Sequence, residues 1–258
     1  MLDQFINVSN VTYQYKSEKG SIEVLNKLDF EVGEGGFTAI VGPSGCGKST
    51  LSKLISGLLT PSDGEIFLQG EKVTSPRANV GMAFQNPVML EWRTVINNVT
   101  LPLEIVSPSM KAKEKEDRAR YLLALVGLEG FENKRPSELS GGMRQRVSLC
   151  RALVHQPEVL ILDEPFAALD AFTREDLWQV MHKLKEKEPF TGILITHDLR
   201  ESIFLADEVI VLSNRPASVQ YLLKVNLAIE RTIDNLFTPK AIEMLNILRE
   251  QIRIAQKR

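Results

Sequence analysis

The sequence is poor in cysteine and carries almost no net charge, and each shortage excludes a class of protein. Only 2 of its 258 residues are cysteines, which is too few for a small secreted fold held together by disulfides. The formal net charge is −2 at pH 7, so no strong field favours a nucleic-acid partner or an anionic membrane. We expect Cys46 and Cys150 to be free thiols, because one lies in a glycine-rich loop and the other in a predicted helix.

Long apolar segments are also missing. No apolar run approaches the roughly 20 residues that a membrane-spanning helix needs. Residues 1–4 lack the basic start and the apolar core of a signal peptide. We therefore expect the chain to stay in the cytosol. With 43% hydrophobic and 25% charged residues, the composition fits an ordinary globular protein with one large domain or two small ones.

A strand, a glycine-rich loop and a helix follow one another early in the chain. Residues 37–41 (FTAIV) form a short apolar run, and residues 49–59 have the pattern of a helix. Between them lies a match to G-x-x-x-x-G-K-[ST], which predicts a phosphate-binding P-loop. Its residues are Gly42, Pro43, Ser44, Gly45, Cys46, Gly47, Lys48, Ser49 and Thr50. We expect Lys48 to reach the β- and γ-phosphates of ATP and the Ser49 hydroxyl to ligate Mg²⁺. Cys46 occupies a variable position of the pattern, as a small filler or as a reactive thiol.

Two other apolar runs end in polar side chains. Residues 159–162 lead into Asp163 and Glu164, and residues 193–195 are followed by Thr196 and His197. Runs this apolar predict buried parallel strands, whose carboxyl ends form the edge where α/β sheets bind ligands. We expect Asp163 to hold Mg²⁺ through its water shell and Glu164 to act as general base toward the attacking water. His197 would contact the γ-phosphate or orient Glu164.

A second phosphate-binding pattern lies at residues 139–145 (LSGGMRQ). Ser140, Gly141 and Gly142 directly precede a helical pattern, and a helix N-terminus beside glycine binds phosphate through backbone N–H groups. The simpler interpretation is an ordinary helix cap in a loop. Because the P-loop is already one phosphate site, the sequence favours two half-sites in one chain.

The order of these motifs resembles the nucleotide-binding subunit of ATP-binding cassette (ABC) transporters over residues 4–215. In that resemblance the P-loop is Walker A, residues 160–164 are Walker B, and residues 139–145 are the signature motif. Three single residues match further family motifs: Gln85 of the Q-loop, Asp170 of the D-loop and the switch residue His197. Tyr15 stands where the family has an aromatic residue that stacks on adenine. Tyr13 is the competing candidate, and the spacing predicts that both tyrosines face the same side of a strand.

The resemblance implies an α/β fold, namely a P-loop NTPase core of the ABC ATPase type with an N-terminal antiparallel β subdomain and a helical signature subdomain. The nucleotide-binding domain would cover residues 4–237, with the helical subdomain at about 87–155 inserted in a RecA-like core. Residues 238–258 would form a helical tail, which either folds onto its own domain or makes a dimer contact. Its apolar residues at helical spacing are Ile242, Leu245, Leu248 and Ile252.

In this family two subunits pair head to tail, so the resemblance implies ATP, Mg²⁺ and a second copy of the chain as ligands and partners. The signature residues of one chain would contact the ATP bound to Walker A of the other. These residues are Leu139, Ser140, Gly141, Gly142, Met143 and Gln145. Ser49, Gln85 and Asp163 would surround the metal. A single chain could then not complete its own site.

Local strings narrow the resemblance to importers of the nitrate, sulfonate and taurine type. The strings are residues 84–95, 163–170, 196–202 and 212–216, and importers of pyrimidine vitamin precursors share them. This resemblance implies a peripheral subunit on the cytoplasmic face of the cell membrane, bound to a transmembrane permease and served indirectly by a solute-binding protein. The cargo would be a small anion (sulfonate, taurine or nitrate) or a pyrimidine vitamin precursor.

One residue beside the Q-loop departs from that subfamily. Glu91 stands where the subfamily usually has proline before tryptophan. Trp92 and Arg93 follow it in the region where the family docks its permease, and both residue types are frequent at interface hot spots. The alternative for Trp92 is burial within its own domain.

A different functional class is a soluble cassette ATPase that works in DNA repair or translation. Repair types carry a long coiled-coil insertion between Walker A and the signature motif, and translation types have two cassettes in one chain. This sequence has a compact predicted helical segment at that place and one cassette. Both features favour transport.

Overall fold

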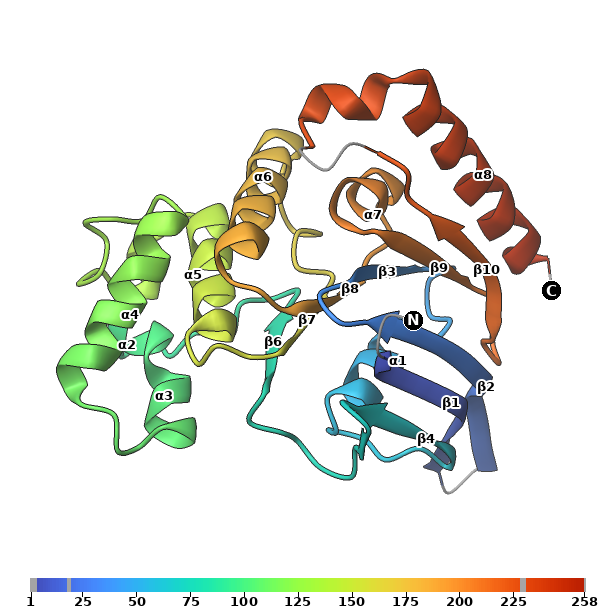
Figure 1. Ribbon diagram of the computed structural model, residues 1–258, viewed down its shortest axis with the longest axis horizontal. Helices are drawn as coiled ribbons and strands as arrows, with labels where there is room; N and C mark the ends of the chain where they lie inside the picture. The colour runs from blue at the N-terminus through green and yellow to red at the C-terminus, as the bar shows by residue number, and fades with distance from the viewer. Residues whose placement is uncertain (1–3, 18–19, 228–230, 258) are drawn as a thin grey trace. The chain divides into compact units, whose positions relative to one another are not determined.

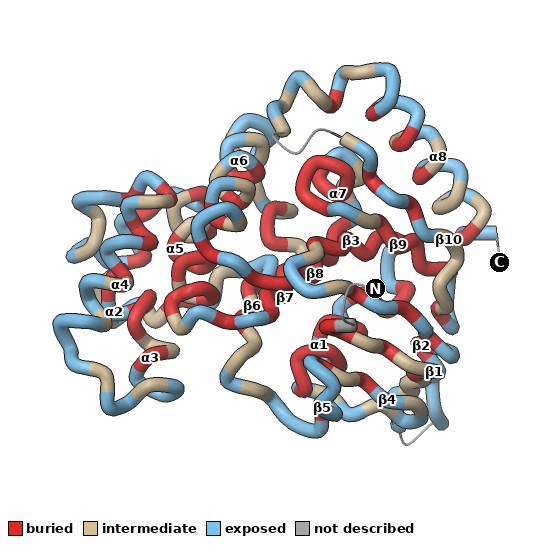
Figure 2. The backbone as a smooth tube through the Cα atoms, viewed as in Figure 1, coloured by how far each residue is buried: buried red, intermediate tan, exposed pale blue. Residues whose placement is uncertain are grey.

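The computed structural model describes residues 4–17, 20–227 and 231–257. The chain forms two compact units: the first unit combines Met1–Arg77 with Thr191–Arg258, and the second unit is Ala78–Phe190. Figure 1 labels the elements of both units, and Figure 2 marks their buried residues. Among the described helices, none combines the length and the apolar character of a membrane span.

An antiparallel sheet begins the first unit. Its strands lie in the order β2-β1-β4-β5. They are β1 (Gln4–Ser17), β2 (Gly20–Gly33), β4 (Asp63–Leu68) and β5 (Glu71–Lys72). The sequence suggests two short strands at residues 5–8 and 11–13, but the structure has one continuous strand. Asn10, with φ 49°, lies within a shift of register between Val8 and Val11. Such an irregularity lets a strand continue along the same partner.

The other strands of the first unit are mostly parallel. They are β3 (Phe37–Val41), β8 (Thr191–Ile195), β9 (Glu208–Leu212) and β10 (Val219–Lys224). Strand β3 pairs in parallel with both β8 and β9, and β10 runs antiparallel to β9. Every residue of β3 and β8 is buried, which explains why these runs are apolar on both faces. Helix α1 (Lys48–Ile55) follows the loop after β3, and α7 (Leu199–Leu205) follows β8.

The C-terminal segment folds onto the first unit. A short 3₁₀ helix, η2 (Ile233–Phe237), precedes α8 (Pro239–Gln256), which contacts α7, β9 and β10. The Thr238 hydroxyl caps α8 by accepting from the Ala241 N–H at 3.3 Å. The buried residues of α8 are Ala241, Met244, Leu248 and Ala255. This stripe shares only Leu248 with the spacing read from the sequence, since Ile242 is exposed and Leu245 and Ile252 are half-buried.

The second unit contains two parallel strands and most of the helices. Strand β6 (Val80–Phe84) pairs with β7 (Val159–Asp163). The helices are α2 (Val95–Val99), α3 (Leu101–Val106), α4 (Ala112–Leu125), η1 (Pro136–Glu138), α5 (Gly141–Leu153) and α6 (Ala171–Lys187). Helix α5 contacts β6, α2, α4 and α6. The segment 87–155, expected to be helical, therefore lies in this unit together with β6, β7 and α6.

One ion pair joins three segments of the second unit. Arg118 of α4 donates to both carboxylate oxygens of Glu188, at 2.7 and 2.5 Å, and to the backbone oxygens of Val154 and Leu153 at 3.3 and 3.2 Å. Its side chain is 17% exposed and that of Glu188 is 9% exposed. The charged run 111–120 is otherwise a mainly solvated helix face, as its pattern indicates. Arg118 is the exception, because its guanidinium closes the ends of α5 and α6.

We predict that Glu188→Ala destabilises the protein by about 3–5 kcal/mol, because it leaves the largely buried Arg118 charge without its partner. Urea unfolding followed by circular dichroism measures the effect. The matched control is Glu250→Ala, which removes an exposed i,i+3 pair with Arg253 and is expected to cost less than about 1 kcal/mol. Equal effects of the two substitutions would contradict a structural role for the Arg118–Glu188 pair.

Candidate nucleotide site

The P-loop joins β3 to α1 in the first unit, and its glycines are required by close contacts. Gly47 has φ +121°, and a Cβ there would lie 2.7 Å from Val24 Cγ1 and 2.8 Å from Leu25 Cδ2. Gly45 has φ +75°, a backbone conformation that other residues rarely adopt. Glycine is therefore needed at Gly47 for the close approach to β2 and favoured at Gly45 by its backbone conformation.

Lys48 points back into the loop. Its ammonium donates to the backbone oxygens of Gly42 and Pro43, each at 3.0 Å, and the residue is only 6% exposed. Gly47, the N-cap of α1, has no side chain to occupy the helix N-terminus. Backbone N–H groups at a helix start and a lysine ammonium are the groups that bind phosphate in such loops. The geometry therefore fits a phosphate-binding loop.

Cys46 is completely buried inside the same loop. Burial raises the pKa of its thiol, and the nearby positive charge of Lys48 opposes that rise. A raised pKa keeps the thiol protonated, and only the thiolate is a strong nucleophile. The structure therefore favours the small filler over the reactive thiol. Cys150 is also buried, and both cysteines are free, as the sequence analysis predicts.

Tyr13 and Tyr15 lie on the same face of β1, as their spacing predicts. Their rings meet edge to face, with centroids 5.0 Å apart and an interplanar angle of 86°. The Tyr15 hydroxyl lies 3.3 Å from the Thr50 hydroxyl in α1, and its ring is partly exposed. Tyr13 is less exposed, and burial raises its pKa, with Tyr15 as the second cause. Of the two, Tyr15 is the better placed to stack on a base beside the P-loop.

His197 lies at the same strand edge as the P-loop. It follows β8, which pairs in parallel with β3 so that Ile195 lies opposite Ile40. The Thr196 hydroxyl shapes the turn: it accepts from the Asp198 N–H at 2.9 Å and donates to Glu201 at 3.0 Å. His197 itself is exposed. The β3–β8 pair therefore carries the P-loop and His197 at one carboxyl edge.

Asp163, Glu164 and Gln85 occupy one edge of the second unit. Asp163 ends β7 opposite Phe84 of β6, and Gln85 follows Phe84 directly. Asp163 is mostly buried, whereas Gln85 is exposed. Glu164 has φ 49°, an uncommon conformation for glutamate. Such backbone strain is frequent at functional sites. The backbone conformation therefore marks Glu164 as a candidate functional residue of this edge.

The signature motif forms the N-terminus of α5. The Ser140 hydroxyl caps the helix by accepting from the Met143 N–H at 3.3 Å, and Ser140 and Gly141 are exposed. Gly142 lies against Thr173 of α6, since a Cβ would come within 2.6 Å of Thr173 Cγ2. The motif is thus a helix cap whose first two residues are accessible.

Asp170 of the D-loop caps α6. Its carboxylate accepts from the Thr173 N–H at 3.0 Å and from the Thr173 hydroxyl at 2.7 Å. These hydrogen bonds hold the pKa of Asp170 below its usual value, and the bond from the Thr173 hydroxyl has the larger effect. Thr173 therefore touches both motifs, because Gly142 packs on its methyl group. The signature helix and the D-loop are fixed to each other within the second unit.

Gln145 is the buried polar residue of the signature motif. It is expected to contact the ATP of another chain, but it is only 2% exposed. Its side-chain amide donates to the backbone oxygen of Phe84 at 3.4 Å. One turn inside α5, the side chain faces β6 rather than the helix N-terminus. This contact supports the strand that leads into Gln85, and a contact of Gln145 with a second chain stays a prediction. The side chain of Leu139 is also buried. A contact of Leu139 with a second chain would therefore be made by its backbone.

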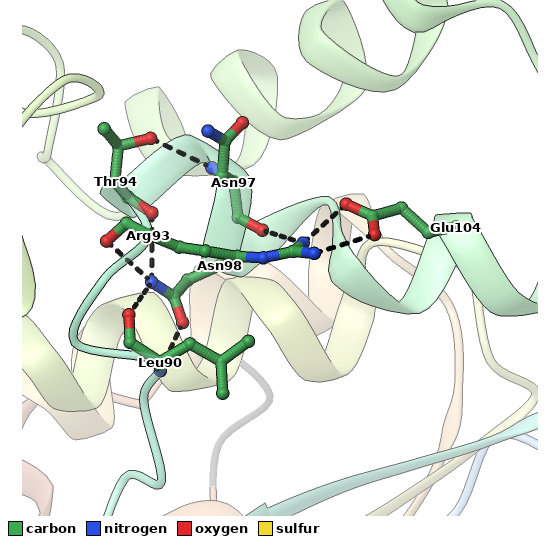
Figure 3. Close-up of polar contacts among 6 residues, drawn as sticks. All are labelled: Leu90, Arg93, Thr94, Asn97, Asn98 and Glu104. Atoms are coloured by element: carbon green, nitrogen blue, oxygen red, sulfur yellow. Dashed lines mark hydrogen bonds and ion pairs between the residues drawn. The ribbon is translucent and has the colours of Figure 1, made fainter.

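Asn98 fixes the loop that carries Trp92 (Figure 3). Its side chain is buried and makes four hydrogen bonds: it accepts from the Leu90 N–H at 2.8 Å and donates to the backbone oxygens of Leu90, Arg93 and Thr94 at 3.1, 3.2 and 3.0 Å. Asn98 is not among the site residues expected from the sequence. The available signal was a polar residue inside the otherwise apolar face of α2.

Trp92 projects from this loop, and the ion pair of Arg93 holds the loop to the next helix. Trp92 is 73% exposed, so its burial within its own unit is wrong. Arg93 donates to both oxygens of Glu104, at 2.6 and 3.2 Å. Val88 and Ile105 are also largely exposed. A fixed loop that exposes an aromatic side chain is typical of a protein-binding surface.

Comparison with protein families assigns the chain. A family model described as ABC transporter matches residues 25–167. The chain belongs to the ABC transporter family. Two curated ABC relatives are the aliphatic sulfonates import ATP-binding protein of Bacillus thuringiensis subsp. konkukian, 38% identical over 88% of each chain, and the bicarbonate transport ATP-binding protein of Synechococcus elongatus, 43% identical over 84% of this chain and 78% of the relative.

Solved structures agree with this assignment. The dimeric structure of an ATP-binding cassette in a post-hydrolysis state, bound to ADP and Pi, matches with a TM-score of 0.76 and 32% identity. The match covers 86% of this chain and 99% of that chain. The expected fold, an α/β P-loop NTPase of the ABC type, is confirmed, and the chain is an ATPase of this family.

We predict that Asn98→Ala lowers the free energy of unfolding of this ABC ATPase by about 2–4 kcal/mol, because it leaves buried backbone groups of residues 90–94 without partners. The control is Asn97→Ala, an exposed neighbour that should cost less than about 0.5 kcal/mol. Urea unfolding measures both variants. If they unfold at the same urea concentration, the four hydrogen bonds do not hold the Trp92 loop.

Proposed function

We propose that this chain is the ATP-hydrolysing subunit of an importer and that two copies pair head to tail around two ATP molecules. The proposal rests on a difference between the two phosphate-binding features: the P-loop lysine bonds to its own loop, whereas the signature N-terminus is exposed. The P-loop directs Lys48 inward, toward its own carbonyl oxygens. The signature N-terminus at Ser140 and Gly141 is exposed, in position to face another chain. The dimeric cassette among its structural relatives supports this pairing.

The residue roles follow the chemistry of each group. In this proposal Tyr15 stacks on adenine, Walker A binds the phosphates, and Glu164 acts as general base with His197 beside the γ-phosphate. Ser49, Gln85 and Asp163 are the proposed ligands of Mg²⁺, because oxygen donors suit this hard cation. Ser140, Gly141, Gly142 and the backbone of Leu139 and Met143 contact the second chain's ATP.

Membrane partners belong to the same proposal. The exposed residues Trp92, Val88 and Ile105 are the proposed permease-docking surface, and the ion pair of Arg93 with Glu104 holds the loop of Trp92. The subunit then lies on the cytoplasmic face of the membrane as a peripheral protein, and a solute-binding protein delivers cargo to the permease. Relatives that serve sulfonate and bicarbonate import support a small anion as cargo. A pyrimidine vitamin precursor is the competing cargo.

A mixing experiment tests the head-to-tail pairing. Lys48→Ala disables Walker A and Ser140→Arg disables the signature motif, so each variant alone should be inactive. In a mixed dimer one site combines both defects, while the other combines an intact Walker A with an intact signature. We therefore predict that an equimolar mixture recovers up to about a quarter of wild-type ATPase activity. About half of the dimers are mixed, and each mixed dimer has one intact site out of two.

Phosphate release by the two variants, separately and mixed, measures this recovery. The control mixes Lys48→Ala with Lys48→Arg, two Walker A defects that cannot complement each other. Activity of Ser140→Arg alone, or no recovery on mixing, would contradict a site shared between chains. ATP binding by Ser140→Arg, measured by equilibrium dialysis, shows that its Walker A remains intact.

The docking surface is tested by Trp92→Ala. We predict that co-purification of the tagged subunit with its permease from detergent extract falls at least about tenfold, because a central exposed aromatic dominates such interfaces. ATP hydrolysis by the isolated subunit should not change. The control is Phe237→Ala, which removes an aromatic residue that is 70% exposed in the first unit. A wild-type subunit that retains no membrane protein would favour the soluble cassette class instead.

A further inference from the structure

Arg215 contacts the outside of the P-loop. It lies in the turn between β9 and β10, and its Nε donates to the backbone oxygen of Gly45 at 2.5 Å. A Cβ on Gly45 would lie 3.5 Å from Arg215 Nη2, so the guanidinium extends over this residue. The motif roles described above do not use Arg215. Its contact is with the loop that would hold the nucleotide.

The turn that carries Arg215 is fixed on three sides. Ser213 and Ser218 close it, with the Ser213 N–H donating to the Ser218 oxygen and the Ser218 N–H to the Ser213 hydroxyl, both at 2.9 Å. Ala217 exchanges two hydrogen bonds with β2, at 2.8 and 2.9 Å, and the Asn214 N–H donates to the Ala255 oxygen at the end of α8 at 3.3 Å. Because the turn is held in this way, the position of Arg215 is largely set before any ligand binds.

Holding the Gly45 oxygen also orients the next N–H group. In a planar trans peptide the C=O of Gly45 and the N–H of Cys46 point in opposite directions. The Cys46 N–H donates to the Pro43 oxygen at 3.3 Å, and the Lys48 ammonium donates to the same oxygen at 3.0 Å. Two phosphate-binding donors therefore converge inside the loop while Arg215 holds the other side of the peptide.

The charge of Arg215 also acts inside the loop. Burial raises the pKa of the Cys46 thiol, and the positive charges of Lys48 and then Arg215 oppose that rise. A cation beside the loop also favours the negative charge of a bound phosphate. Arg215 is exposed, so solvent screens part of this effect.

We propose that Arg215 is a positioning residue for ATP, which holds the Gly45 peptide so that the Cys46 N–H faces the phosphates. The proposal rests on the proposed function, since it assigns a further residue to the same nucleotide site. A hydrogen bond from a guanidinium to a carbonyl oxygen is of the stronger, charge-assisted kind. The contact exists before ATP arrives, so Arg215 should lower the KM for ATP without changing kcat, as uniform binding does.

Arg215→Ala, Arg215→Lys and wild type are compared in steady-state ATP hydrolysis with Mg²⁺. We expect Arg215→Ala to raise KM about 3- to 10-fold with kcat within about twofold, and Arg215→Lys to lie between the two, because it keeps the charge but not the planar fork. The rise in Tm caused by a fixed ATP concentration should shrink in the same order, while Tm without ATP stays within about 2 °C.

The matched control is Arg249→Ala, an exposed arginine on α8, which should behave as wild type. An unchanged KM in Arg215→Ala, or a loss confined to kcat and to Tm without ATP, would overturn the role of Arg215. Absence of ATP hydrolysis and of ATP binding in the wild type would instead overturn the proposed function. The two failures are thus distinguished by the wild-type measurement.

Discussion

The contact of Gly47 with β2 is the constraint on which the nucleotide site depends. Without a side chain at Gly47, the loop lies directly on Val24 and Leu25, where any Cβ would come within 2.8 Å of both side chains. The same short stretch of β2 hydrogen-bonds Ala217 of the β9–β10 turn. One segment of the antiparallel sheet therefore positions the inner wall of the P-loop and also the turn that carries Arg215. Residues far apart in the sequence share this support.

The two phosphate-binding features solve the problem of unpaired N–H groups in opposite ways. In the P-loop, Lys48 and the Cys46 N–H already bond to carbonyl oxygens of the loop, so the donors are satisfied while the loop keeps its shape. At the signature motif, the Ser140 hydroxyl satisfies the Met143 N–H, and Gly141 remains exposed. A loop that supports itself can bind nucleotide first. In the proposed dimer, the exposed helix cap would contribute once a second chain approaches.

Local sequence patterns predict the parts of the site that depend on neighbouring residues. The P-loop, the apolar strands that end at Asp163 and before His197, and the shared face of the two tyrosines all follow from spacing within a few residues. The patterns do not predict contacts between distant segments. Arg118 meets Glu188 and Arg215 meets Gly45 across 70 and 170 residues, and nothing local distinguishes these arginines from solvated ones. The hydrogen bond from Gln145 to Phe84 is another such contact, because motif membership does not indicate which side of the helix a residue occupies.

The buried position of Lys48 has a consequence for how ATP must bind. A largely buried ammonium needs partners, and here the Gly42 and Pro43 oxygens supply them. An arriving phosphate has to replace those bonds, which lowers the net gain from the new contact below that of a bare charge pair. The favourable contribution to binding that remains is the preorganised shape of the loop. The loop does not have to fold around the ligand, because Gly47 and Arg215 already hold the loop in place. Affinity in this site should therefore depend more on the groups that fix the loop than on the number of charges that meet the phosphate.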